Sequence, residues 1–357
     1  MRVFFPGLDD AELEAAVRRH LASAVELLTG DQLPDPPDHE WIVSGRPQPE
    51  WLTASPRLRG IVIPFAGLPA TTRDLMLEHP DLAVYNLHHN AAPTAELALA
   101  LLLAAAKSVP SVDRALRRGD WGDRYGTSNA ILLADTTALI VGYGAVGKRI
   151  GDALAAMGMH VTAIRRRAGA ASSSDSATAS SGTPISSEST TSTPRPGAAV
   201  SEPTAPGSPA AIYGPEALPE LLPTAHVVVI AVPLTPETKG MIGERELSLL
   251  PERALLVNIG RGPIVDEAAL FAALKDGRLG GAGIDVWYRY PKSEDEVRNT
   301  FPSEFPFHEL DNVVLSPHRG GDTRETEDLR GAHLAELLNT LARGESPATR
   351  IDVTAGY

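Results

Sequence analysis

A glycine-rich turn follows a short apolar stretch and opens a helical one; its residues are Gly142-Tyr143-Gly144-Ala145-Val146-Gly147. Three glycines at this spacing, between a strand and a helix, are typical of the first crossover of a doubly wound parallel sheet. The first glycine permits the tight turn, the second lets a ligand approach the backbone, and the third allows the helix to pack closely on the strand. Free N–H groups at the helix start favour an anion. The turn therefore predicts a dinucleotide-binding α/β sheet.

Short apolar runs alternate with helical stretches along the rest of the chain. In the first unit we expect strands at 3–5, 41–43, 60–64 and 84–86, a helix from Ala11 to about Leu28, and another from Thr94 to about Lys107. In the second unit we expect strands at 138–141, 160–164, 226–231, 254–258, 283–286 and 312–315, and a closing helix at about 324–343 that packs back on the first unit. This alternation predicts an α/β protein with parallel sheets.

One segment, residues 168–211, interrupts the alternation. It consists of Ser, Thr, Ala, Pro and Gly with hardly any large apolar residue. Such a segment cannot bury enough surface to offset the entropy of ordering it. We therefore expect a disordered insertion, and favour a tolerated loop expansion over a regulatory segment. The two units predict a substrate domain (1–107 with 322–357) and a dinucleotide-binding domain (108–321).

Composition narrows the class of protein. The 357 residues include no cysteine, which excludes disulfides, thiolate metal sites and a cysteine nucleophile. A net charge of −13 gives no general attraction to nucleic acid or to an anionic membrane. The N-terminus does not resemble a signal peptide, and the most apolar stretch, 97–106, is too short to span a bilayer. We expect a cytoplasmic protein with no metal, nucleic-acid partner or membrane partner.

Arginines follow the strand at 160–164, at Arg165, Arg166 and Arg167. An acidic residue at this point would hydrogen-bond the ribose hydroxyls of NAD. A guanidinium cannot accept those hydrogen bonds, but it pairs well with a 2′-phosphate. The arginines therefore predict a preference for NADP(H), with NAD(H) as the other possible cofactor. The alternative is that they are solvated surface beside the insertion.

Polar motifs end three strands of the second unit, where ligands of open α/β sheets bind. They are Val232-Pro233-Leu234-Thr235-Pro236-Glu237-Thr238, Val257-Asn258-Ile259-Gly260-Arg261-Gly262-Pro263-Ile264-Val265-Asp266 and Leu315-Ser316-Pro317-His318-Arg319-Gly320-Gly321. Arg261 can clamp a carboxylate and polarise the neighbouring carbonyl. His318 can donate a proton to an alkoxide and take it back. Beside a dinucleotide turn, these residues indicate hydride transfer at a carbonyl.

Taken in order, the motifs resemble those of the D-isomer-specific 2-hydroxyacid dehydrogenase family, which includes phosphoglycerate, glyoxylate/hydroxypyruvate and formate dehydrogenases. The resemblance covers almost the whole chain outside the insertion, and also rests on Gly281-Ala282-Gly283-Ile284-Asp285-Val286. It implies a flavodoxin-like substrate domain, a Rossmann-like dinucleotide-binding domain and an active site between them. It also implies a homodimer and a small acid as substrate.

The resemblance implies further site residues. Ala66, Gly67 and Leu68 match the loop whose backbone amides bind the substrate carboxylate. Asn90 matches an asparagine that contacts substrate in the formate dehydrogenase branch. Besides the glycine turn, Arg165 and Arg166, the residues expected at the cofactor are Val232, Pro233, Thr238, Ile259, Gly260, Arg261, Asp285, His318 and Gly320.

The chain departs from the family at the partner of the catalytic histidine. The family usually has a Glu before a Pro shortly after the Asp-Val pair, and here Tyr290 stands in its place. A phenol can hydrogen-bond an imidazole, but it supplies no negative charge near pH 7. We therefore expect the pKa of His318 to lie below that of a Glu-paired histidine. Glu294, Asp295 and Glu296 are alternative partners.

Several functions stay open at this point. A 2-oxo acid reductase of the glyoxylate/hydroxypyruvate type is favoured. A formate- or phosphonate-type dehydrogenase is suggested by Asn90 and the missing Glu. A non-catalytic dinucleotide sensor on the same fold is disfavoured by the presence of both Arg261 and His318.

Overall fold

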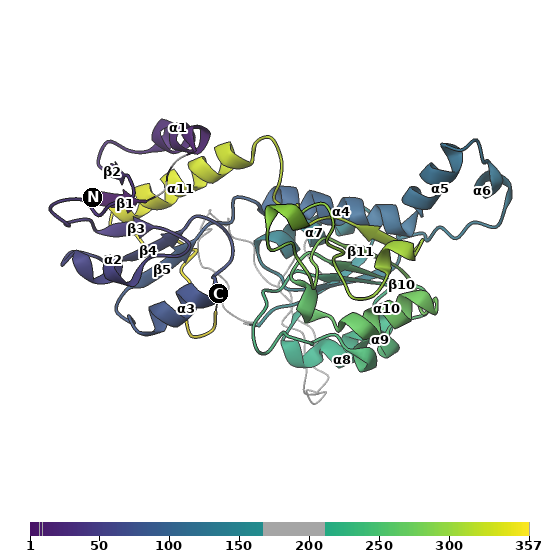
Figure 1. Cartoon of the computed structure of the whole chain (residues 1–357). Helices are drawn as coiled ribbons and strands as arrows, with labels where there is room; N and C mark the ends of the chain where they lie inside the picture. Colours follow the sequence, from purple (N-terminus) through teal and green to yellow (C-terminus); the bar gives the residue numbers. More distant parts are fainter. Residues whose placement is uncertain (7, 9, 167–210, 357) are drawn as a thin grey trace, which may run out of the picture.

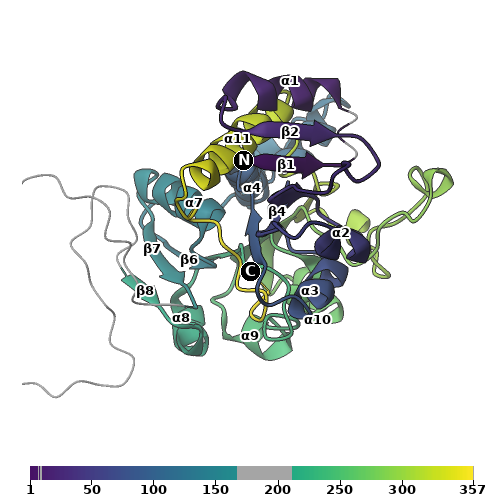
Figure 2. The same ribbon diagram turned by 90° about the vertical axis from the view of Figure 1, so that its left-hand side faces the viewer.

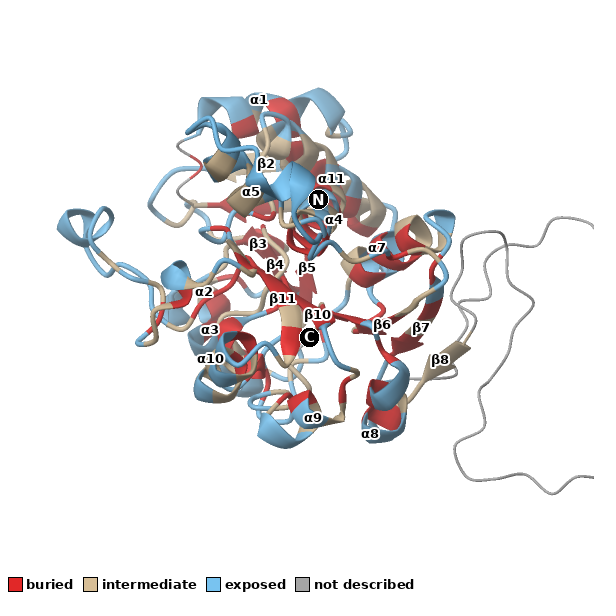
Figure 3. Cartoon of the chain, turned by 90° about the vertical axis from the view of Figure 1, so that its right-hand side faces the viewer, coloured by how far each residue is buried: buried red, intermediate tan, exposed pale blue. Residues whose placement is uncertain are grey.

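The computed structural model describes residues 1–6, 8, 10–166 and 211–356. These residues form two lobes, each built on a sheet whose paired strands are all parallel (Figure 1). Buried residues concentrate in the strands and on the helix faces that cover them (Figure 3). The α/β class with parallel sheets is confirmed. The predicted insertion lies outside the described residues, except for Ala211.

The first lobe has the strand order β2-β1-β3-β4-β5, which is flavodoxin-like. Its strands are β1 (Arg2–Phe5), β2 (Glu26–Thr29), β3 (Trp41–Val43), β4 (Gly60–Ile63) and β5 (Ala83–Asn86), and its helices include α1 (Ala11–His20), α2 (Pro49–Ala54) and α3 (Ala70–Leu77). Figure 2 shows α1 and α11 (Thr326–Ala342) beside β1 and β2.

The helix predicted from Ala11 to Leu28 is wrong in its second half. The Asp10 carboxylate caps the helix start, but the helix ends at His20 and Leu21 is extended. Residues 26–29 instead form β2, an edge strand that pairs with β1. The apolar residues in this short stretch fit a helix face and an edge strand equally well, so periodicity does not separate the two.

The second lobe has the strand order β12-β11-β10-β9-β6-β7-β8, a Rossmann-like arrangement. Its strands are β6 (Thr137–Val141), β7 (His160–Ile164), β8 (Ala211–Tyr213), β9 (Val227–Ile230), β10 (Ala254–Asn258), β11 (Leu279–Ile284) and β12 (Val313–Leu315). Its helices are α7 (Ala145–Ala156), α8 (Leu218–Leu221), α9 (Glu244–Leu249) and α10 (Glu267–Lys275), with short 3₁₀ turns η1 (Pro215–Ala217), η2 (Leu222–Thr224), η3 (Gly262–Ile264), η4 (Glu294–Glu296) and η5 (Phe307–Glu309).

Two elements of the second sheet differ from the prediction. The edge strand β8 was not predicted, because its three residues directly follow the Ser/Ala/Pro-rich stretch. Strand β11 begins at Leu279, earlier than the predicted 283. Gly280 and Gly281 hide the strand signal at its start, because glycine is depleted in strands. Further along, Gly283 allows close helix packing, since a Cβ there would lie 2.6 Å from Leu101 Cβ.

Helices α4 (Ala91–Ala106) and α11 carry the chain between the lobes. Helix α4 packs on β10, β11 and α7 of the second sheet, whereas α11 packs against α1. The predicted return of the closing helix to the first lobe is confirmed. The domain boundaries stay a prediction, and the core contacts of α4 lie with the second lobe.

A projecting arm follows α4 and contains α5 (Val109–Leu116) and α6 (Gly122–Tyr125), neither of which has a buried residue (Figure 1). Within the described residues, no single helix is long and apolar enough to cross a membrane. Only α4 and α5 taken together, across a 65° bend, reach that length and composition. Much of α4 is buried against the second sheet.

Candidate active site

The glycine turn has the shape that a dinucleotide needs. Gly142 has a φ of +105°, and a Cβ there would lie 2.7 Å from the Ala231 carbonyl carbon. A Cβ on Gly147 would collide with the Gly142 carbonyl oxygen, whereas a Cβ on Gly144 would meet nothing within 4 Å. Helix α7 has no side-chain cap, and its first intrahelical bond runs from the Lys148 N–H to the Gly144 carbonyl. Open space in front of uncapped amides fits a pyrophosphate.

The arginines that follow β7 lie at the edge of this site. Arg165 and Arg166 are exposed, and the Arg165 N–H donates to the Tyr213 carbonyl at 2.9 Å, which continues the β7–β8 pairing. Glu237, in the 233–238 loop, is an acidic group that the Arg166 charge affects. A hydrogen bond from Thr235 lowers the pKa of its carboxyl group, and the charges of Arg166 and Arg73 lower it further. Arg166 is therefore close enough to the 233–238 loop to act on an anion there.

Arg261 stands on a turn that Asn258 shapes. Asn258 is buried; its Oδ1 accepts the Gly260 N–H at 3.1 Å and its Nδ2 donates to the Arg261 carbonyl at 3.1 Å. The Arg261 Nη1 donates to the Gly260 carbonyl at 2.7 Å. A Cβ on Gly67 would lie 3.4 Å from Arg261 Nη2. The guanidinium of the second lobe therefore meets the predicted carboxylate-binding loop of the first.

His318 has a left-handed backbone, with a φ of +56°, which is uncommon for a residue other than glycine. Asp285 holds this turn. Its carboxylate, only 2% exposed, accepts hydrogen bonds from the Ser316 hydroxyl at 2.5 Å, the Arg319 N–H at 2.9 Å and the Gly320 N–H at 3.0 Å. Trp287 Nε1 also donates to the Ser316 carbonyl, at 2.7 Å. The Asp285 carboxylate is thus committed to positioning His318, and its predicted contact with the cofactor stays a prediction.

Tyr290 is the hydrogen-bond partner of His318. Its hydroxyl lies 3.0 Å from His318 Nδ1 and accepts the Trp287 N–H at 3.0 Å. The Trp287 N–H occupies one lone pair of the phenol oxygen, so the hydroxyl can donate to an unprotonated Nδ1 or accept from a protonated one. Among the alternative partners, the Glu296 carboxylate instead accepts the Lys292 N–H at 2.8 Å.

The electrostatic surroundings of His318 favour its neutral form. Partial burial lowers its pKa from the usual 6.5, the Arg261 charge lowers it further, and Asp285 opposes them. A Glu partner would add a strong opposite effect, since a nearby negative charge favours the imidazolium. The direction agrees with the expectation from Tyr290.

The start of the interlobe helix also reaches the His318 loop. A Cβ on Gly321 would lie 3.0 Å from Asn90 Cβ, and a Cβ on Gly320 would lie 3.2 Å from Thr94 Cγ2. The predicted site residues from both lobes therefore meet in one region.

The loops that follow β9 and β10, where cofactor contacts are predicted, meet beside the glycine turn. A Cβ on Gly142 would lie 2.8 Å from Val232 Cγ1, and a Cβ on Gly260 would lie 2.6 Å from the Val232 carbonyl oxygen. Thr238 Oγ1 donates to the Pro233 carbonyl at 2.7 Å and closes the 233–238 loop, whereas Ile259 is buried.

Some residues of the site were not predicted. Ser316, Trp287 and Thr94 support the His318 loop, as the distances above show. Ser316 stands next to the Pro317-His318 motif, but its bond to Asp285 spans 31 residues of sequence, for which the motifs give no signal.

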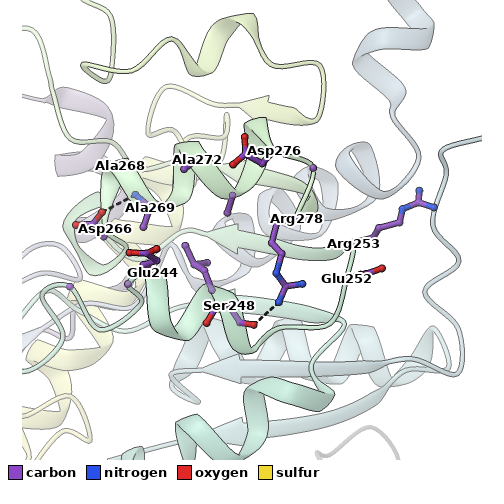
Figure 4. Close-up of a pocket in the computed structure, with 15 residues that line it drawn as sticks. Glu244, Ser248, Glu252, Arg253, Asp266, Ala268, Ala269, Ala272, Asp276 and Arg278 are labelled. Carbon is purple, nitrogen blue, oxygen red and sulfur yellow. Dashed lines mark hydrogen bonds between the residues drawn. The ribbon is translucent and has the colours of Figure 1, made fainter.

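A separate hollow of about 1030 Å³ lies between α9 and α10 (Figure 4). Asp266 in its wall caps α10 by accepting the Ala269 N–H, and Arg278 donates to the Ser248 and Leu250 carbonyls at the end of α9. Both side chains therefore already hydrogen-bond backbone groups at the helix ends. Arg261 and His318 do not line the hollow. No group of three or more His, Asp or Glu side chains able to hold a metal occurs within the described residues.

Comparison with known proteins places the chain in a family. The profile of the NAD-binding domain of D-isomer specific 2-hydroxyacid dehydrogenases matches residues 99–188 and 200–320. The chain belongs to this family. The family predicted from the motifs is thereby confirmed, and the profile covers the glycine turn, Arg261 and His318.

Curated relatives of the family are similar over most of this chain. A glyoxylate reductase of Pyrococcus furiosus is 36% identical over 265 residues, which cover 72% of this chain and 65% of the relative. A D-3-phosphoglycerate dehydrogenase of Mycobacterium tuberculosis (strain H37Rv) is 28% identical over 355 residues, 94% of this chain and 58% of the relative. The chain thus spans less than two thirds of the length of these relatives.

Solved structures share the fold over the full chain. A D-isomer specific 2-hydroxyacid dehydrogenase from Xanthobacter autotrophicus Py2, in complex with NADPH and MES, superposes with a TM-score of 0.72 at 23% identity, covering 100% of this chain and 99% of that one. An NADPH-dependent glyoxylate/hydroxypyruvate reductase from Sinorhizobium meliloti, in complex with NADP and sulfate, gives 0.68 at 21% identity with the same coverage. The predicted two-lobed fold is confirmed.

Proposed function

We propose that this chain is an NAD(P)-dependent 2-hydroxyacid dehydrogenase that reduces a small 2-oxo acid of the glyoxylate or hydroxypyruvate type. The observation that carries the proposal is the meeting of three groups between the lobes: Arg261, the Gly67 loop and the His318–Tyr290 pair. Arg261 and His318 follow strands β10 and β12 of the lobe that carries the glycine turn, and the Gly67 loop follows β4 of the first lobe. The names of the glyoxylate reductases among the relatives support the substrate class.

Different residues bind the substrate, polarise its carbonyl and donate the proton. The amides of the 66–68 loop and Arg261 hold the substrate carboxylate, and Arg261 also polarises the adjacent carbonyl. When bound, the reduced nicotinamide supplies a hydride to the carbonyl carbon. His318, in its protonated form, gives the Nε2 proton to the oxygen and is left neutral with its hydrogen on Nδ1, which donates to the Tyr290 hydroxyl oxygen.

A substrate panel tests the proposal. NADPH oxidation is followed with glyoxylate, hydroxypyruvate, pyruvate, phenylpyruvate and 2-oxoglutarate, and NADP⁺ reduction with formate. Glyoxylate or hydroxypyruvate should give the highest kcat/KM. Tight NADPH binding without any turnover would contradict the proposal and favour a dinucleotide sensor.

Formate or phosphonate oxidation is the second candidate. Tyr290 in place of a carboxylate is the observation that favours it. Burial and the Arg261 charge lower the pKa of His318, the uncharged partner adds no negative charge to raise it, and hydride removal from formate needs no proton relay. Turnover of formate and of no 2-oxo acid in the panel would establish this candidate instead.

We expect the cofactor preference to be for NADP(H). Two similar solved structures hold NADPH or NADP, and Arg165 and Arg166 lie exposed at the end of β7. The native chain should favour NADPH over NADH in kcat/KM by about tenfold or more. Arg165→Asp should remove most of that preference and spare NADH, while Arg245→Asp on the exposed face of α9 should change neither value. A strong native preference for NADH would contradict the expectation.

We expect the pH profile to depend on residue 290. Reduction needs protonated His318, whose pKa is lowered from 6.5, so reductive kcat/KM should fall with rising pH in a range below 6.5. Tyr290→Glu places a carboxylate beside Nδ1 and should move this fall upward by about one to three pH units. Tyr290→Phe removes the hydrogen bond without adding charge and should leave the fall at acid pH. An identical profile for Tyr290→Glu and the native chain would argue against the His318–Tyr290 pairing.

We also propose that the chain forms a homodimer. The projecting arm supports this, because Trp121 is 61% and Tyr125 84% exposed and Leu116 and Leu132 are exposed nearby. Large exposed apolar side chains gathered on one element are typical of a protein–protein contact. The cytoplasmic location stays a prediction.

A further inference from the structure

Three successive carbonyl groups beyond the end of β4 are held by three different donors. The Pro64 carbonyl accepts Arg330 Nε at 2.9 Å, the Phe65 carbonyl accepts the Leu87 N–H at 3.3 Å, and the Ala66 carbonyl accepts Asn86 Nδ2 at 2.7 Å. Leu87 follows β5 and Arg330 belongs to α11, so the donors come from two elements that lie far apart in sequence. The oxygens of the loop are thus turned toward β5 and α11.

The N–H groups of the same peptides point away from these donors. In a trans peptide the carbonyl oxygen and the following N–H point in opposite directions. A bond that holds the Ala66 oxygen therefore directs the Gly67 N–H away from Asn86. Within the described part of the chain, the N–H groups of residues 66–68 donate to no protein acceptor. A Cβ on Gly67 would lie 3.4 Å from Arg261 Nη2, so Gly67 lies beside the Arg261 guanidinium.

Asn86 is well suited to fix one peptide. It is the last residue of β5 and only 6% exposed. A buried amide that lost its acceptor would not regain a full set of bonds to water, so the Asn86–Ala66 bond resists rotation of the loop peptide. Arg330 is less buried. Its Nη1 also forms an ion pair with Glu327 at 3.1 Å, so the side chain that hydrogen-bonds Pro64 is fixed to α11.

We propose that Asn86 is a positioning residue for substrate binding: it orients the Ala66–Gly67 peptide so that the Gly67 N–H meets the substrate carboxylate opposite Arg261, and Arg330 holds the preceding turn of the loop in the same way. The inference rests on the proposed function for the identity of the ligand. It assigns no contact between Asn86 and the substrate.

The first test is Asn86→Asp in the full chain. Aspartate keeps the shape but cannot donate to the Ala66 carbonyl, so the peptide is released. The KM for the best 2-oxo acid should rise about tenfold, kcat should stay within about threefold, and the Kd for NADPH should not change. Asn339→Asp is the matched control, because Asn339 Nδ2 also donates to a backbone carbonyl of the first lobe, that of His20 at 2.9 Å, away from the loop.

A second variant covers the case in which Asn86→Asp does not fold. Arg330→Leu removes the donor to Pro64 and should raise the same KM in the same direction by a smaller factor. Arg343→Leu is its control, since Arg343 is an exposed arginine just after α11 whose ion pairs and hydrogen bond to Thr340 lie on the surface.

Binding of oxamate, a non-reactive analogue of a 2-oxo acid, is measured by calorimetry with NADPH bound. Loss of oxamate affinity in Asn86→Asp, with the control unaffected, supports the positioning role. This holds even if the native chain reduces none of the 2-oxo acids. Absence of turnover by the native chain would contradict the proposed function alone. Unchanged KM and oxamate affinity in both variants overturn the inference, whatever happens to the Tm. An equal loss in Asn339→Asp, or a native chain that neither binds oxamate nor turns over, overturns it as well.

Discussion

Replacing His318 with asparagine is expected to lower kcat/KM for the 2-oxo acid by roughly 10²- to 10⁴-fold, the usual contribution of a general acid. Asparagine tolerates the left-handed backbone that His318 adopts at a φ of +56°, so the loop should keep its shape. It cannot deliver a proton to the developing alkoxide. The loss should therefore appear mainly in kcat, with NADPH affinity nearly unchanged.

The pH profile provides the check on this result. The native profile should show the fall assigned to His318, and His318→Asn should lack it because the proton donor that causes the fall is gone. His20→Asn, at the exposed end of α1, is the matched control and should retain the native rate. Activity within tenfold of the native chain would contradict a proton-donating role for His318.

Replacing Arg261 with glutamine is expected to lower kcat/KM by roughly 10²- to 10³-fold, since it removes a charged donor from the reacting carbonyl. Arg261 borders Gly67 across the lobes, so the KM for the acid should also rise. Arg261→Lys should recover only part of the loss, because an ammonium cannot make the two parallel hydrogen bonds of a guanidinium.

A second readout separates this role from a structural one. The Arg261 charge lowers the pKa of His318. Removing it should move the pH at which the residual reductive activity falls to a higher value, whereas Arg245→Gln on α9 should move neither rate nor profile. A fall at the native pH in Arg261→Gln would mean that the two side chains do not share one site.

The fold could be predicted wherever strands are buried on both faces. Runs such as 227–230 and 254–257 are apolar throughout because helices cover both sides of a parallel sheet. The wrong predictions concern an edge strand, β2, and a strand that packs closely on a helix, β11. Strand β2 is half exposed, and its apolar residues also fit a helix face. In β11, glycines weaken the strand signal, and Gly283 makes room for Leu101 of α4.

The reactive and ligand-binding groups of the site could be predicted from the sequence alone. A glycine turn after a strand, Arg261 and His318 at strand ends, and a missing Glu at Tyr290 can be recognised because each motif is local, and local spacing fixes which groups face the carboxyl end of a sheet. These motifs were enough for the family and for the class of reaction that we propose.

Only the tertiary structure decided which groups act on one another. Tyr290 rather than Glu294–Glu296 meets His318, Asp285 holds the His318 turn, and Asn86 holds Ala66 across 20 residues. The physical reason is that a hydrogen bond depends on distances of about 3 Å and on direction. Such distances between segments far apart in the chain are set by the packing of two sheets and the helices α4 and α11 between them, and no local spacing encodes them.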